Sequence, residues 1–148
     1  IFLYLKILVI NILMDSLMNL TLKESELTID AFKELITQLD LCKKVDSKAI
    51  VLKFGATWCK PCQVIKERCH SYFRQMPSSV KCYNIDIDEN TELYTFLKTK
   101  RMINGVPTLL GYINRSDRET NLWHIPDISV SGSNSTNIDI FFQRINDY

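Results

Sequence analysis

Two cysteines three positions apart, Cys59 and Cys62, are the residues of this chain best suited to chemistry. They follow an apolar run, residues 49–54, that has the length and branched side chains of a buried strand. Apolar residues recur at helical spacing over 59–76, so we expect a helix to begin at Cys59. The unpaired N–H groups and the positive dipole end of a helix start favour a thiolate over a thiol. Cys59 is therefore predicted to be reactive near neutral pH.

The second cysteine can complete a redox cycle with the first. Cys62 lies about one helical turn from Cys59, close enough to form a disulfide with it. Attack by Cys59 on a substrate disulfide would give a mixed disulfide, and attack by Cys62 would then release the reduced substrate. Pro61 suits the first turn of a helix, where no N–H bond is lost. Lys60 adds a positive charge that favours the thiolate.

A zinc site is the alternative for this cysteine pair. Cys69 and His70 would complete a cluster with Cys59 and Cys62. All four would lie on one continuous helix, which is a poor way to surround a tetrahedral ion. We therefore expect no metal and no other cofactor. The remaining cysteines lie among apolar residues and are predicted to be small core residues: Cys42, Cys69 and Cys82.

Composition narrows the class of protein. The 148 residues suit one domain. A net charge of +1 gives no reason to expect nucleic acid as a partner. An odd number of cysteines, five, in a chain this long does not indicate a secreted disulfide scaffold. A reducing compartment is favoured, and we expect the cytoplasm.

The first residues form an apolar run, 1–14, that is too short to cross a membrane as a helix. It has no clear basic start or cleavage site of a secretory signal. Two interpretations stand equal: the run precedes a true start at Met14, or it is an apolar helix that packs on a surface. A membrane anchor or secretory signal is less favoured. We divide the chain into an N-terminal extension, 1–19, and a domain, 20–148.

Strand-like and helix-like segments alternate along the chain. Weak strand patterning at 18–29 is followed by a helix that Asp30 could cap. This order predicts an α/β fold in which a central mixed sheet has helices on both faces. The later segments are a strand at 49–54, a helix at 59–76, a strand at 80–88, a helix at 92–100, strands at 108–113 and 128–132, and a helix at 137–145.

Several stretches together resemble the thioredoxin family. The sequence WCKPC at 58–62 is similar to the family's active-site motif, with lysine where glycine is usual. The sequence GVPT at 105–108 resembles the loop that holds the family's cis-proline. YNIDIDEN at 83–90 and VSGSNS at 130–135 resemble its third strand and its last turn. The resemblance covers about residues 20–146 and implies the thioredoxin fold.

The resemblance also implies roles for individual residues. Cys59 would be the nucleophile and Cys62 the resolving thiol. Pro107, if cis, would present the backbone of Val106 to an extended substrate segment. X-Pro bonds are rarely cis, and it is the motif context that favours the cis form over an ordinary turn proline. The exposed surface around the thiols would be formed by Trp58, Lys60 and Pro61.

A lysine is the most consequential departure from the family pattern. Thioredoxins usually carry a buried acid at the position of Lys53, and that acid exchanges protons with the resolving thiol. Three alternatives stand. A buried Lys53 could lose its charge and act as a base, it could stay charged and favour both thiolates, or it could extend to the edge and take no part.

Two further departures affect the elements around the thiols. Glu67 stands where the family has a proline that kinks the helix. The segment 114–127 is longer than a tight hairpin loop. Trp123 and His124 in this segment could form a contact surface, but a tolerated insertion is the favoured interpretation.

The sequence predicts a thiol–disulfide oxidoreductase that reduces protein disulfides, because Pro61 resembles the reducing members of the family. Its partners would be disulfide-containing proteins and a reductase or small-thiol electron donor, with no membrane partner. Two alternatives are kept. The protein could be an oxidase or isomerase of an oxidising compartment, or a binding module that does no chemistry. The presence of both Cys59 and Cys62 argues against the module.

Overall fold

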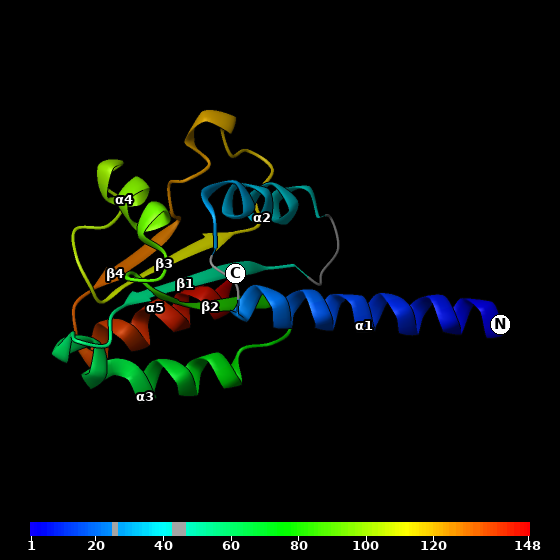
Figure 1. Ribbon diagram of the computed structural model, residues 1–148, viewed down its shortest axis with the longest axis horizontal. Helices are drawn as coiled ribbons and strands as arrows, with labels where there is room; N and C mark the ends of the chain where they lie inside the picture. Colours follow the sequence, from blue (N-terminus) through cyan, green and yellow to red (C-terminus); the bar gives the residue numbers. More distant parts are fainter. Residues whose placement is uncertain (25–26, 43–46) are drawn as a thin grey trace.

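Figure 1 shows the computed structural model, which describes the backbone of residues 1–24, 27–42 and 47–148 and the side chains of 1–13, 27–42 and 47–148. A four-stranded sheet lies between two layers of helices, and the first helix projects to one side. In chain order the elements are α1 (Phe2–Glu24), α2 (Ile29–Leu41), β1 (Ala49–Gly55), α3 (Lys60–Gln75), β2 (Val80–Asp86), α4 (Thr91–Thr99), β3 (Thr108–Ile113), the 3₁₀ turn η1 (Thr120–Leu122), β4 (Ile128–Ser131) and α5 (Ser135–Asp147).

The sheet is mixed, as predicted. Its strand order is β2-β1-β3-β4. β1 pairs in parallel with β2 and antiparallel with β3, and β3 pairs antiparallel with β4. The parallel pair requires a crossover, and α3 supplies it. β1 is thus hydrogen-bonded on both sides, and it leads directly into the predicted thiol site.

Successive side chains of β1 point to opposite faces of the sheet. Ile50, Leu52 and Phe54 join the core cluster under α2 and α4. Ala49 and Val51 join the cluster under α3 and α5. Helices therefore cover both faces, as Figure 1 shows. By the same alternation Lys53 belongs to the face that α3 covers.

The start of the chain differs from the prediction. The expected strand within 18–29 does not form: α1 continues to Glu24 and α2 begins at Ile29, while residues 25–26 lie outside the described part. Leucine, methionine, lysine and glutamate are good helix formers, so a helix already begun at Phe2 extends through them. Thr28, not Asp30, caps α2, because its Oγ1 accepts the N–H of Ala31 at 3.1 Å.

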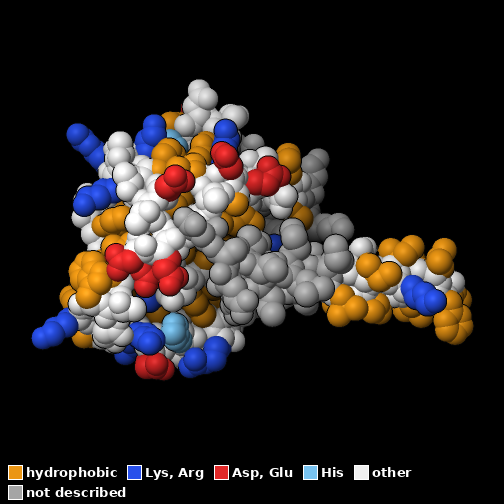
Figure 2. Space-filling view, viewed as in Figure 1, with side chains coloured by type: hydrophobic (Ala, Val, Ile, Leu, Met, Phe, Trp, Pro, Cys, Tyr) orange, Lys and Arg blue, Asp and Glu red, His pale blue; other side chains and the backbone are white. Residues whose placement is uncertain are grey.

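The first half of α1 carries exposed apolar side chains on all sides. Residues 1–13 are all exposed, and Figure 2 shows them as a rod of hydrophobic side chains that extends from the body. Within the described residues, no helix has the length and apolar character needed to cross a membrane. The predicted boundary between residues 19 and 20 falls inside α1 and stays a prediction.

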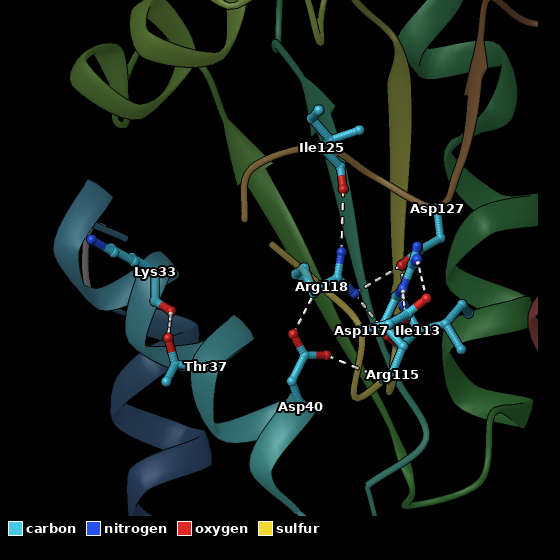
Figure 3. A network of polar contacts seen from close by, with 9 residues as sticks. All are labelled: Lys33, Thr37, Asp40, Ile113, Arg115, Asp117, Arg118, Ile125 and Asp127. Atoms are coloured by element: carbon cyan, nitrogen blue, oxygen red, sulfur yellow. Dashed lines mark hydrogen bonds and ion pairs between the residues drawn. The ribbon is translucent and has the colours of Figure 1, made fainter. Parts of the chain in front are cut away.

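The long connection between β3 and β4 is held by one arginine. The Arg118 guanidinium bonds the carboxylates of Asp40, at 2.7 Å, and Asp127, at 2.9 Å. It also donates to the backbone oxygens of Ile113 and Ile125, so it joins α2 to both ends of the connection (Figure 3).

His124 is buried and Trp123 is half-buried, and a contact surface at these two residues stays a prediction. Trp123 stacks on Phe96 and packs edge-on against Phe32. His124 is buried and contacts both the Phe96 and Trp123 rings. These aromatic side chains extend the core under α2 and α4, so the connection is an ordered part of the domain.

Candidate active site

The predicted thiols lie where β1 passes into α3. Cys59 is the N-cap of α3, and the backbone N–H of Cys62 donates to Cys59 Sγ at 3.3 Å. Pro61 occupies the first turn of the helix, as expected. The two cysteines form a disulfide, with their Cα atoms 5.2 Å apart. An N–H directed at Cys59 Sγ would stabilise a negative charge on that sulfur after reduction.

The loop before β3 brings a second segment to the disulfide. The Val106–Pro107 peptide bond is cis. The Val106 carbonyl oxygen lies 3.8 Å from Cys59 Sγ. Pro107 is buried, and its carbonyl accepts the N–H of Gly132, the first residue after β4, at 3.0 Å. Gly132 has a φ of 88°, which glycine adopts without strain. The sheet edge therefore fixes the loop beside the sulfur.

Exposed residues surround a largely buried disulfide. Cys59 and Cys62 are only 5% and 3% exposed, whereas Trp58 is 66% exposed. Trp58 Nε1 donates to Asp88 Oδ2 at 2.9 Å, which fixes the indole beside the thiols. Lys60 and Pro61 are also exposed. Asp88 was not predicted as a site residue, although it lies in the YNIDIDEN stretch that carries part of the resemblance.

Lys53 lies behind the disulfide and is only 4% exposed. Its Nζ donates to Asn84 Oδ1 on the paired strand β2 at 3.0 Å. A β-carbon built on Gly55 would lie 3.6 Å from Cys62 Sγ and 3.7 Å from Lys53 Nζ, so the amine and the sulfur border the same space. Burial is the main cause that lowers the pKa of Lys53. The buried amine argues against the alternative in which Lys53 extends to the edge, and its part in proton exchange stays a prediction.

The other cysteines lie away from the sulfur pair. Cys69 is fully buried in the core under α3 and α5, and burial raises its pKa to about 11. It is therefore a neutral thiol near pH 7, as expected for a core residue. Cys42 and Cys82 are only half-buried, so the prediction of core residues holds fully for Cys69 alone.

Comparisons with known proteins agree with this geometry. The family model described as Thioredoxin matches residues 24–122. Thioredoxin 3 of Plasmodium falciparum is 34% identical over 98 residues, which are 66% of this chain and 48% of that protein. Thioredoxin-1 of Saccharomyces cerevisiae is 31% identical over 85 residues, 54% of this chain and 78% of that protein. The chain thus spans only about half of the first of these relatives.

Solved structures show the same architecture. A crystal structure of Plasmodium falciparum thioredoxin is 29% identical, with a TM-score of 0.51, and the match covers 76% of this chain and 80% of that one. Fasciola hepatica thioredoxin has a TM-score of 0.55 at 23% identity, covering 78% of this chain and 91% of that one. The second likeness is one of fold alone.

Proposed function

The chain belongs to the thioredoxin family, and from this membership we propose that it reduces protein disulfides through a reversible Cys59–Cys62 dithiol/disulfide. Family and fold support thiol–disulfide oxidoreductase activity. The observation that carries the proposal is the place of the disulfide: Cys59 caps α3 and receives the Cys62 N–H. Membership of the family supports the class of reaction, and the proposal adds the reducing direction and the roles of the individual residues.

The reaction begins from the reduced protein. The Cys59 thiolate attacks one sulfur of a substrate disulfide, a mixed disulfide forms, and the other substrate sulfur leaves as a thiolate that takes a proton from solvent. Cys62 then loses its proton and attacks Cys59 Sγ, which breaks the mixed disulfide and releases the second substrate thiolate. The substrate gains two electrons and the protein is left with its disulfide.

Substrate binding would use the surface around Cys59. The Val106 backbone beside Cys59 Sγ suits main-chain pairing with an extended substrate segment, and the adjoining Pro107 holds that backbone in place. Trp58, Lys60 and Pro61 would contact the flanking residues of the substrate. Because protein disulfides share only the disulfide and the backbone, this mode of binding favours breadth of substrates over selectivity.

The partners follow from the chemistry. Disulfide-containing proteins are the proposed substrates, and a reductase or small thiol must return two electrons to the protein. We place the cycle in the cytoplasm, where a reducing thiol pool can supply them. A buried lysine close to Cys62 is the one observation that favours the oxidase alternative, because a positive charge favours thiolates over the disulfide.

Trapping tests the order of attack. Cys62→Ser should accumulate a mixed disulfide with a disulfide-containing protein substrate, because the first attack proceeds and the second cannot. Cys59→Ser should trap none. Mass spectrometry of both variants after mixing with substrate measures this. Equal trapping by the two variants would contradict the roles, and failure of the wild-type protein to reduce any disulfide would favour the binding module.

A further inference from the structure

A cavity of about 100 Å³ lies beside the disulfide, between β1, β2 and α3. Cys62 lines it together with Lys53 and Asn84. On α3, Lys66 and His70 follow Cys62 at intervals of four residues, which places all three on one face of the helix. Both line the cavity too, so cationic or basic groups border it from two elements.

These groups are not matched by acids. Within the described residues, Lys53 Nζ has one hydrogen-bond partner, Asn84 Oδ1, and forms no ion pair. Lys66 and His70 likewise form no ion pair within the described part of the chain. Asp86 is the acid that lines the cavity, and its Oδ1 accepts the N–H of Asp88. Burial, with the charge of Lys53, lowers the pKa of His70, which is therefore a neutral base near pH 7. With Lys53 and Lys66 both protonated against Asp86, the lining has an excess of positive charge.

We propose that this cavity binds a small inorganic anion such as chloride when Cys59 and Cys62 are disulfide-bonded, and that reduction of the disulfide weakens the binding. A buried cation with unfilled hydrogen-bonding capacity is costly, and an anion offsets that cost. The cavity has room for several water-sized particles, which suits a partly hydrated ion. Burial lowers the pKa of Lys53, and a bound anion acts in the opposite direction.

Coupling to the redox state follows from the position of Cys62. Reduction by a dithiol breaks the Cys59–Cys62 bond, oxidises the dithiol to its disulfide and passes two electrons to the protein sulfurs. The dithiol's protons go to the protein thiols, or to the buffer where a thiolate remains. Any thiolate at Cys62 competes with the anion for the same positive charge. By linkage, an anion that binds the oxidised form more tightly makes the pair more reducing.

A chloride titration tests the binding directly. Oxidised protein is titrated with sodium chloride at constant ionic strength, with sodium gluconate as the balancing salt. Amide NMR shifts are followed at Gly55 and Asn84, which line the cavity. The expected result is a saturable shift in the oxidised protein and a weaker affinity in the reduced protein. Lys53→Met should lose the saturable shift. Lys33→Met, which removes the same charge from an exposed site on α2, should keep it.

The outcomes distinguish a specific anion site from a diffuse ion atmosphere, and redox-dependent binding from binding that ignores the redox state. A shift that grows linearly, or that is the same in Lys53→Met and Lys33→Met, would show a diffuse ion atmosphere and overturn the site. Equal affinity in the two redox states would overturn the coupling. If Lys53→Met does not fold, Lys66→Gln on the helix surface should weaken the affinity, and an unchanged affinity would count against the site. The titration uses no substrate, so it is independent of the proposed reductase activity, on which only the redox consequence rests.

Discussion

A lysine amine that shares a small space with the resolving sulfur alters the balance between thiolate and disulfide. Lys53 and Cys62 border the same volume behind the active-site turn. An interior positive charge interacts with a nearby thiolate more strongly than it would in water. A protonated Lys53 is therefore expected to favour the reduced, thiolate-bearing state, and it would make the pair less reducing than its relatives that carry an acid there.

Replacing Lys53 with methionine keeps the stem of the side chain and removes the charge. We expect the Lys53→Met pair to be more reducing by about 30 mV, which corresponds to about 1.4 kcal/mol for two electrons. We also expect slower alkylation of Cys59 at neutral pH, because less thiolate is present. Equilibrium titration against glutathione in chloride-free buffer measures the potential.

Lys33→Met is the matched control for both measurements. It should leave the potential and the alkylation rate at their wild-type values. If Lys53→Met also leaves both unchanged, the lysine has no electrostatic influence on the thiols and its placement is structural.

At the scale of elements, the β3–β4 connection depends on Arg118. This side chain is only 7% exposed and binds the carboxylates of Asp40 on α2 and of Asp127 just before β4. Arg118→Ala would remove the buried guanidinium from Asp40 and Asp127, which would keep only their contacts with Arg115 and, for Asp127, the Ile113 N–H. We expect a loss of about 3 kcal/mol in the free energy of unfolding, as for other buried pairs that lose one partner. Chemical denaturation measures it.

Arg115→Ala is the comparison for that loss. Arg115 also pairs with Asp127, but its side chain is 43% exposed, and ion pairs that water reaches contribute less. The loss should be much smaller than for Arg118. Equal losses would mean that burial does not set the contribution of these ion pairs.

Asp127 should make stability depend on pH. Burial alone would raise its pKa, but the Ile113 N–H and the Arg115 and Arg118 guanidinium groups outweigh burial and hold the pKa below its usual value. A carboxyl group whose pKa is lower in the folded protein than in the unfolded chain stabilises the fold when it is ionised. This stabilisation is fully present above the pKa of the unfolded chain, about 3.9, and it is lost as pH falls through the pKa of the folded protein. Asp127→Asn should therefore be less stable at pH 7.

The pH profile of that variant provides the check. The difference in unfolding free energy between Asp127→Asn and wild type should narrow below about pH 4, where the carboxylate of the unfolded chain becomes protonated, and further as pH falls through the lower folded pKa. Unfolding free energies measured from pH 7 down to pH 3 test this. A gap that stays constant would show that the carboxylate charge is not the source of the stability.

The sequence predicts what depends on local patterns. Strand 108–113 coincides with β3, and the helix expected from Cys59 begins at Lys60, because apolar spacing and the proline in the first turn are local signals. The Arg118–Asp40 pair joins residues 78 positions apart, and no local sequence pattern predicts it. Similarly, the contacts of Lys53 with Asn84 and of Trp58 with Asp88 depend on how β1 and β2 align. The thiols, Trp58, Lys53 and the loop of Pro107 were predictable from local motifs, whereas Asn84 and Asp88, which hold two of these side chains, were not.

At the scale of the whole molecule, the first half of α1 is a large exposed apolar surface. Side chains from Ile1 to Leu13 are turned to solvent, and such patches promote association. Removing residues 1–13 should leave the melting temperature of the domain nearly unchanged, because exposed side chains contribute little to its core. It should also reduce self-association, as sedimentation velocity would measure. A large drop in melting temperature would contradict this view of α1.

The central position of β1 has a consequence for how the molecule opens. β1 is paired on both edges, and its side chains enter both core clusters. Its amide hydrogens are held in the ladders with β2 and β3, so they exchange only when the centre of the sheet opens, and they should be among the slowest to exchange. Edge elements can fray and recover without disturbing it. The turn that carries the disulfide is therefore attached to the most persistent part of the fold. Repeated thiol–disulfide exchange with large protein substrates should leave that part of the fold intact.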